Sequence, residues 1–191
     1  MKILDKIIND LNKKISIAIG CFDGIHIGHQ QVIKKILEKK EVGMLPAVFT
    51  FSENPKFMNA GEKGKNIILL DEKHKILSDI GVSVLYNIDF LTIKNLSPQE
   101  FVKDILVKRL KVGHVACGFN FSFGYKGGAT VQDLKNLCEI YNIEVDIVEP
   151  VLYRSLPVSS TEIRKAIKLG DIKRASELLG RPLLIKSSEV K

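Results

Sequence analysis

Cysteine is scarce in this sequence, and long apolar runs and low-complexity tracts are absent. No apolar run approaches the roughly 20 residues that a membrane-spanning helix needs, so no membrane partner is expected. The three cysteines, Cys21, Cys117 and Cys138, are odd in number and show no CxxC spacing. This pattern disfavours a disulfide framework and a zinc site. It suits the reducing cytoplasm, so we expect a cytoplasmic protein with buried thiols.

Charges of both signs are present, with an excess of basic residues. The chain has 29 lysines and arginines against 22 aspartates and glutamates, which gives a formal net charge of +7. A basic balance suits anionic partners, either nucleic acid or phosphorylated small molecules. The lysines are scattered, and neither a Lys/Arg block nor an RNA-binding signature is present. We therefore do not expect nucleic acid as a partner.

Apolar runs that are typical of buried strands alternate with segments of helical periodicity. The first 14 residues predict an amphipathic helix rather than a signal peptide, because they carry apolar residues at helical spacing and no cleavage signature. Continuous apolar strands separated by helices predict an α/β fold, a Rossmann-like doubly wound parallel sheet of about five strands with helices on both faces. At this length we expect a single domain over 1–186 and a tail over 187–191. Strands are predicted over 15–20, 44–51, 82–88, 112–118 and 143–151, and further helices over 28–40, 71–80, 97–110, 131–141, 159–170 and 171–182.

Capping signals mark several helix ends. Two glycine- and polar-rich stretches, 52–66 and 118–130, are too long for simple connectors and are candidate functional loops. The residues expected to cap or end helices are Asp71, Ser97 with Pro98 and Glu100, Gly170, Asp171 and Gly180.

The stretch GCFDGIHIGHQ, residues 20–30, lies between the first predicted strand and the helix that follows it. Ligands of open parallel sheets bind beyond the carboxyl ends of strands, where a helix that begins near Gly28 directs unpaired N–H groups. His26 and His29 flank Gly28, so both can reach one anion. The spacing is neither GxGxxG nor a lysine-containing P-loop, and a zinc site would lack a third ligand. We interpret this stretch as a binding site for the phosphates of a nucleotide triphosphate. The alternative is that both histidines only pack against neighbouring side chains.

A second helix start with anion-binding chemistry lies near the end of the chain. Ser159, Ser160 and Thr161 stand at the N-terminus of a predicted helix, and Arg164 follows one turn later on the same side. A guanidinium can form two hydrogen bonds to a phosphate. This segment is therefore a candidate second anion-binding site. The alternative is that it only caps the helix.

These motifs resemble those of a known family. The stretch GCFDGIHIGHQ resembles the HxGH motif of the nucleotidylyltransferase superfamily, and in its longer form it is similar to the prokaryotic FAD synthetase (FMN adenylyltransferase) family. Three more stretches agree in order and spacing, and the resemblance covers about residues 15–185. They are VFTFSENP (48–55), CGFNFSFGYKGGAT (117–130) and VSSTEIRKAIKLGDIKRASELLGRP (158–182).

The resemblance implies that the chain is an enzyme that transfers the adenylyl group of ATP to FMN, giving FAD and pyrophosphate. It implies direct in-line attack without a covalent intermediate, with Mg²⁺ accompanying ATP; no magnesium ligand and no oligomeric state are assigned. The implied catalytic residues are His26, His29, Asn120, Ser160 and Arg164. The implied ATP-binding residues are Gly20, Cys21, Phe22, Asp23, Gly24, Gly28, His29, Ser159, Thr161 and Arg164. The flavin-binding candidates are Phe51, Asn54, Pro55, Phe57, Phe101, Asn120 and Phe121, since a flat ring needs apolar walls and a few donors.

The sequence also departs from the family pattern. Where the family often has Thr-Phe-x-Pro-His-Pro, this chain has Thr-Phe-Ser-Glu-Asn-Pro over 50–55, so one proline and a histidine are missing. No motif of the riboflavin kinase domain found in bifunctional members is present, and we expect adenylylation without riboflavin phosphorylation. Two alternatives stay open: an adenylyl- or cytidylyltransferase with another phosphorylated acceptor, and a non-catalytic nucleotide- or flavin-binding protein.

Overall fold

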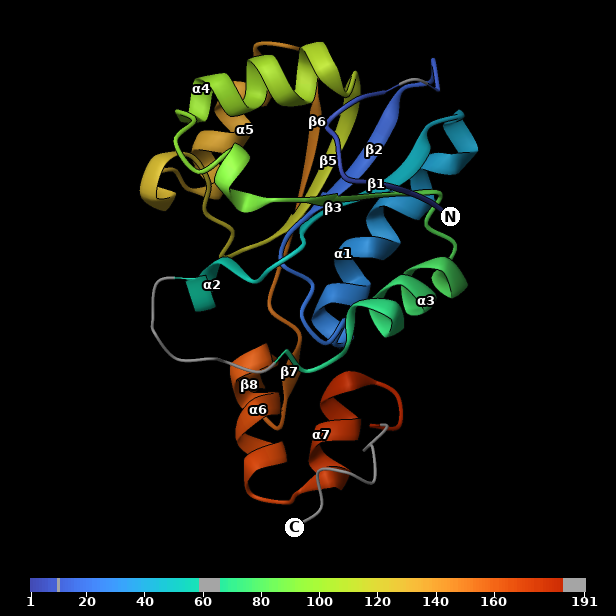
Figure 1. Ribbon diagram of the computed structural model, residues 1–191, viewed down its shortest axis with the longest axis vertical. Helices are drawn as coiled ribbons and strands as arrows, with labels where there is room; N and C mark the ends of the chain where they lie inside the picture. The colour runs from blue at the N-terminus through green and yellow to red at the C-terminus, as the bar shows by residue number, and fades with distance from the viewer. Residues whose placement is uncertain (10, 59–65, 184–191) are drawn as a thin grey trace.

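The computed structural model describes residues 1–9, 11–58 and 66–183, and its centre is a six-stranded parallel sheet (Figure 1). The strands lie in the order β1-β4-β3-β2-β5-β6, and all neighbouring pairs are parallel. This confirms the predicted parallel α/β sheet, with six strands in place of about five. The bounds are Lys2–Leu4 for β1, Ile15–Ile19 for β2, Leu45–Phe51 for β3, Val84–Ile88 for β4, Val112–Gly118 for β5 and Glu144–Val148 for β6.

Helices cover both faces of the sheet, as expected for strands that are apolar on both sides. On one face, buried residues of α1 and α3, such as Ile33 and Leu77, pack on Ala18 and Val48 of the sheet. On the other face, a π-helix and α5 pack on the remaining apolar residues of the strands. The helix bounds are Ile27–Glu38 for α1, Pro55–Met58 for α2, Leu70–Ile80 for α3, Pro98–Glu100 for α4, Phe101–Arg109 for the π-helix and Val131–Glu139 for α5, with a 3-10 turn at Lys39–Val42.

The direction of winding reverses between β2 and β5, which lie side by side in the sheet. From β2 the chain proceeds through β3 to β4 toward one edge, whereas β5 and β6 extend the sheet toward the other edge. Ligands of open parallel sheets bind at such a reversal, beyond the carboxyl ends of the strands. The loop over 20–26, which follows β2 and carries the histidine motif, begins at this point.

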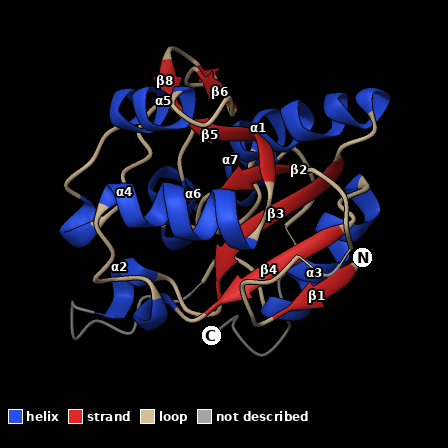
Figure 2. Ribbon diagram, turned by 90° about the horizontal axis from the view of Figure 1, so that it is seen from above, coloured by secondary structure: helices blue, strands red, loops and turns tan. Residues whose placement is uncertain are grey.

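The prediction of an amphipathic helix over the first 14 residues is wrong. Lys2–Leu4 instead form β1, which pairs with Val84–Tyr86 at the edge of the sheet (Figure 2). After β1, Ile7 is buried and the Tyr86 hydroxyl donates a hydrogen bond to the carbonyl of Ile8 at 3.0 Å. A short isolated helix is marginal in water, whereas an open sheet edge offers unpaired backbone groups, so tertiary pairing overrides the local pattern.

The predicted capping signals are confirmed at most helix ends. Ser97 and Glu100 form a capping box at the start of α4, and Asp171 accepts a hydrogen bond from the N–H of Arg174. Asp71 is not a cap: Leu69 occupies that position, and Asp71 lies in the first turn of α3. A carboxylate is favourable there because it faces the positive end of the helix dipole.

The last two helices form a unit of their own beyond the carboxyl end of the sheet. A short hairpin of β7 (Leu152–Tyr153) and β8 (Leu156–Pro157) leads to α6 (Ser160–Lys168) and α7 (Ile172–Leu179). Figure 1 shows α6 and α7 together at one end of the molecule, apart from both helical layers. The predicted boundary between the domain and its tail lies outside the described residues. Across the described part of the chain, no helix has the length and apolarity required to cross a membrane.

Candidate active site

The loop between β2 and α1 is anchored by other elements of the fold. Its first residue, Gly20, donates its N–H to a carbonyl of β3 at 3.1 Å. The carbonyl of Cys21 accepts hydrogen bonds from Thr50 Oγ1 at 2.9 Å and from Lys73 Nζ at 3.0 Å. Phe22 buries its ring and adopts a left-handed φ of +47°. These contacts define the path of the loop.

His26 and His29 meet at the start of α1. His26 is the N-cap, and its Nδ1 accepts the N–H of His29 at 3.2 Å. The two imidazole rings stack with centroids 3.6 Å apart and planes 17° from parallel. Gly28 allows this arrangement, because a Cβ there would lie 3.2 Å from the His26 ring. Since Nδ1 is the acceptor, the hydrogen-bond pattern assigns the proton of neutral His26 to Nε2.

Burial keeps both imidazoles neutral near pH 7. Desolvation lowers the pKa of His26 to about 4, and the charge of Arg181 acts in the same direction. The pKa of His29 also lies well below its usual value, mainly because of burial and to a smaller extent because of His26 and Lys73. Each neutral ring therefore offers a single N–H donor rather than a positive charge.

The N-terminus of α6 lies against the same loop. Ser159 is the N-cap of α6, and its Oγ accepts the N–H of Glu162 at 3.3 Å. Ser160 Oγ donates to the backbone carbonyl of Asp23 at 2.8 Å, across 137 positions of sequence. Thr161 is exposed in the first turn of the helix. The structure thus places the two predicted anion-binding sites, at the starts of α1 and α6, on either side of one loop.

Asp23 also connects the loop to α6 through its side chain. One carboxylate oxygen accepts the N–H of Ile67 at 2.9 Å, and the other forms an ion pair with Arg164. The Arg164 guanidinium lies over the ring of Phe57, 5.0 Å from its centroid. The Nε of Arg164 is buried and has no partner among the described residues. Arg164 therefore has hydrogen-bonding capacity left at this junction.

Two side chains without a predicted role hold α7 against the loop. Arg181 donates to the carbonyls of Gly24 at 2.7 Å and Ile25 at 3.1 Å. Gln30 donates to the carbonyls of Ile25 at 3.0 Å and Leu179 at 2.9 Å. The last residue of the quoted motif is thus a bridge between α1 and α7. The role of Arg181 could not be predicted from the sequence, because the segment Gly-Arg-Pro is also typical of the end of a helix.

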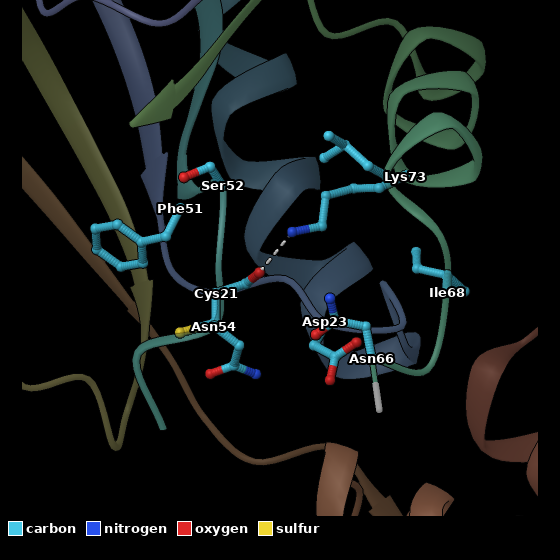
Figure 3. Close-up of a pocket in the computed structure, with 9 residues that line it drawn as sticks. Cys21, Asp23, Phe51, Ser52, Asn54, Asn66, Ile68 and Lys73 are labelled. Carbon is cyan, nitrogen blue, oxygen red and sulfur yellow. Dashed lines mark hydrogen bonds between the residues drawn. The ribbon is translucent and has the colours of Figure 1, made fainter. Parts of the chain in front are cut away.

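A pocket opens beside the loop, between α3 and the segment that follows β3. Figure 3 shows the Lys73 side chain extending from α3 to the carbonyl of Cys21. The ring of Phe51 points away from Lys73. The pocket brings together residues predicted to bind ATP and residues predicted to bind the flavin. Its lining residues are Cys21, Asp23, Phe51, Ser52, Asn54, Asn66, Ile68, Leu70 and Lys73.

The flavin-binding candidates fall into two groups. Phe51 and Asn54 line the pocket, Pro55 begins α2, and Phe57 lies under Arg164. This first group surrounds the segment that follows β3. Residues 59–65 of the predicted functional loop lie outside the described residues.

The second group belongs to the segment after β5 and to the core. Phe101 is 3% exposed and contacts Phe49 and Phe123, so the structure does not bring it to the pocket. Phe121 stacks on Phe123 with centroids 5.9 Å apart, and Asn120 is exposed just beyond β5. Phe123, the third phenylalanine of this stretch, is buried in the hydrophobic core.

Lys73 is the residue of this site that the sequence prediction missed. It is buried on α3, with 9% of its surface exposed. A sequence signal existed, because Lys73 precedes the buried Leu77 by four positions and so falls on the apolar stripe of its helix. A lysine on such a stripe needs a polar partner inside the protein.

Metal-binding side chains come together elsewhere in the fold. His114, Glu144 and Asp146 bring three possible ligand atoms within 4.8 Å of one another. His114 already bonds Ser16 at 2.7 Å and Asp146 at 3.2 Å, and Glu144 pairs with Lys39 at 2.6 Å. This cluster lies at the amino ends of β2 and β6, at the opposite end of the sheet from the loop over 20–26.

The sequence is similar to known proteins over most of its length. A model of the FAD synthetase family matches residues 8–162. A bifunctional riboflavin kinase/FMN adenylyltransferase of Listeria monocytogenes is 37% identical over 185 residues, which cover 95% of this chain and 58% of the relative. A FAD synthetase of the same organism is 33% identical over 172 residues, covering 88% and 70%. The chain thus spans little more than half the length of its bifunctional relatives.

Known structures share the fold. A crystal structure of a Streptococcus pneumoniae protein, described as a macrolide-efflux protein, superposes with a TM-score of 0.80 at 33% identity, over 95% of this chain and 60% of that one. A pantoate-beta-alanine ligase from Francisella tularensis has a TM-score of 0.59 at 21% identity, over 91% of this chain and 79% of its own, and supports the fold alone. Because the FAD synthetase model matches residues 8–162, most of its length, this chain belongs to the FAD synthetase family.

Proposed function

We propose that this protein transfers the adenylyl group of ATP to the phosphate of FMN, releasing pyrophosphate and forming FAD. The observation that carries the proposal is the junction at Asp23. There, Ser160 and Arg164 of α6 bind the loop that leads into the histidine-capped start of α1. Two helix N-termini directed at one loop provide unpaired N–H groups and positive potential for a polyphosphate.

The reaction needs alignment more than acid–base chemistry. The attacking oxygen belongs to a phosphate that is already anionic at neutral pH, so no residue has to remove its proton. The oxygen forms a bond to the α-phosphorus, and the bond to the bridging oxygen of pyrophosphate breaks. His26 and His29 donate N–H groups to the phosphate oxygens, and Arg164 adds a fixed charge, in line with stabilisation by preorganised donors.

Magnesium would enter the site bound to ATP, as part of the substrate MgATP. Asp23 is the one carboxylate among the described pocket-lining residues, and its two oxygens already bond Ile67 and Arg164. Magnesium usually keeps several waters and binds substrate phosphates together with one or two carboxylates. The triphosphate and water would therefore supply most of its ligands.

The flavin is proposed to lie at the segment that follows β3. Phe51 and Asn54 line the pocket there and Phe57 is close by, which offers aromatic surface with a polar group beside it. Glu53 and Asn54 replace family residues in this segment, so the contacts to the ring differ from the family pattern.

The proposal is tested by incubating the protein with FMN, ATP and Mg²⁺ and separating the flavins by chromatography. We expect FAD from FMN, with riboflavin as the parallel substrate. Parallel reactions with CTP, and with other phosphorylated acceptors, follow pyrophosphate release. Turnover with another acceptor but not FMN would identify a different nucleotidylyltransferase. Binding of ATP and FMN without any product would identify a non-catalytic binding protein.

A further inference from the structure

Lys73 places a buried ammonium group in the wall of the pocket. Its Nζ donates to the carbonyl of Cys21 at 3.0 Å and lies 3.4 Å from Thr50 Oγ1, which is itself completely buried. Thr50 donates its own proton to Cys21, so it can accept one from Lys73. An ammonium group has three N–H donors, and these two contacts use two of them.

The charge of Lys73 has no dedicated carboxylate in the described part of the chain. The neighbouring Asp23 forms its ion pair with Arg164, and Glu72 lies 4.0 Å from Arg181. Burial accordingly lowers the pKa of Lys73, and the nearby charge of Asp23 only partly opposes this effect. A buried cation that shares its nearest anion with another cation indicates that a further anion completes the site.

The position of Lys73 in the pocket indicates which anion completes the site. The pocket is lined by Cys21 and Asp23 of the loop over 20–26 and by Ser52 and Asn54 of the segment after β3. In the proposed reaction the attacking phosphate must lie between the flavin and the α-phosphate of ATP. Lys73 extends from α3 to the carbonyl of Cys21, in the wall of the pocket that both segments line (Figure 3).

We propose that Lys73 binds the phosphate of the acceptor substrate through its remaining N–H, and thereby selects a phosphorylated flavin over an unphosphorylated one. The inference rests on the function proposed above. Its chemical role is to offset the repulsion between two anions, the attacking phosphate and the triphosphate, while the bond to the α-phosphorus forms. No proton transfer by Lys73 is required.

The test compares FMN with riboflavin, which differ only in the phosphate. Flavin fluorescence titrations are done with the wild type, Lys73→Met, Lys73→Arg and the control Lys75→Met, which changes an exposed lysine of the same helix. We expect Lys73→Met to weaken FMN binding about ten-fold or more, as for loss of a hydrogen bond to a charged group, and to leave riboflavin binding within about two-fold. Lys73→Arg should restore part of the preference for FMN, and Lys75→Met should behave as the wild type.

The outcomes separate this inference from the function on which it rests. If the wild type makes FAD but Lys73→Met keeps the full preference for FMN, or loses both flavins equally, the inference about Lys73 is wrong and the function stands. A third titration, with a non-hydrolysable ATP analogue, tests whether Lys73 binds the triphosphate of ATP instead of the phosphate of the flavin. A loss confined to that analogue places Lys73 on the triphosphate and overturns the inference. A wild type that binds neither flavin overturns both proposals.

Discussion

Asp23 and Arg164 are 141 residues apart in the chain and form an ion pair between the loop after β2 and α6. The Asp23 side chain is 6% exposed and that of Arg164 is 29% exposed, so the pair is largely shielded from water. The same aspartate also binds Ser160 through its backbone carbonyl. Asp23 is therefore the residue through which the two halves of the candidate site are held together.

Breaking this ion pair should cost stability as well as activity. We expect Asp23→Asn and Arg164→Met each to lower the free energy of unfolding by roughly 2 kcal/mol, because each leaves a partly buried group without its partner. The double variant should lose less than the sum of the two, which urea unfolding measures. A strictly additive double variant would contradict the assigned contact. As a control, Lys75→Met breaks an exposed pair with Asp79 and should have no measurable effect.

Removing His29 should affect the reaction rate far more than folding. In His29→Ala we expect a fall in kcat/KM of roughly 10- to 150-fold, corresponding to about 1.5–3 kcal/mol for one hydrogen bond to a charged group. Thermal unfolding checks that the variant is folded. Gln31→Ala, an exposed change in the same helix, serves as the matched control. Near-wild-type activity of His29→Ala would refute its role.

The buried imidazoles make the stability of the protein depend on pH. The folded-state pKa of His26, about 4, lies below the usual value of 6.5, so the unfolded chain binds more protons between these values. The stability is therefore fully present above pH 6.5 and is lost as the pH falls toward 4. We expect a loss of about 2 kcal/mol between pH 7 and 5 from this residue.

The variant His26→Asn isolates that contribution. Asparagine is a favourable N-cap and does not titrate, so the start of α1 should be preserved. Urea unfolding at several pH values should show a shallower decline for His26→Asn than for the wild type. Identical slopes for the two proteins would show that His26 is not the buried, neutral group described above.

The close approach of α7 to α1 can be measured at Gly180. This residue has a φ of +70°, and a Cβ would lie 2.6 Å from Ile27 Cγ2. Gly43 has a similar φ of +79° but nothing within 4 Å. Both Gly→Ala variants should lose about 1 kcal/mol or more from the left-handed backbone. Gly180→Ala should lose a further 1–3 kcal/mol through overpacking, seen in urea unfolding; equal losses would argue against close packing there.

Much of the fold followed from the alternation of apolar strands with helical segments. Those elements are long, and their buried faces repeat regularly, so local patterns define them. The N-terminal segment failed for the opposite reason: β1 has three residues, and its pairing with β4 depends on a contact 82 positions away at Lys2 and Val84. No local signal carries information about such a pairing.

The two anion-binding sites were predictable because helix-start chemistry is local, at His26 and at Ser159. That both helix starts lie against one loop is seen in the structure, through the contacts of Asp23 with Ser160 and Arg164. Lys73 was not predicted, and Phe101 was predicted at the flavin site but lies in the core. In both cases the role of the side chain depends on which neighbours the fold brings to it. The same residue types are elsewhere an exposed lysine and a pocket-lining phenylalanine.

The attachment of α6 to the loop at Asp23 also sets the order in which the protein can become competent during synthesis. A nascent chain that has left the ribosome as far as β6, which ends at Val148, contains every strand of the sheet and the histidine-capped helix. It still lacks Ser160 and Arg164, two of the residues proposed to bind phosphate. Under the proposed function, adenylyl transfer begins only after α6 and α7 have emerged and docked, so the folding of the sheet precedes activity.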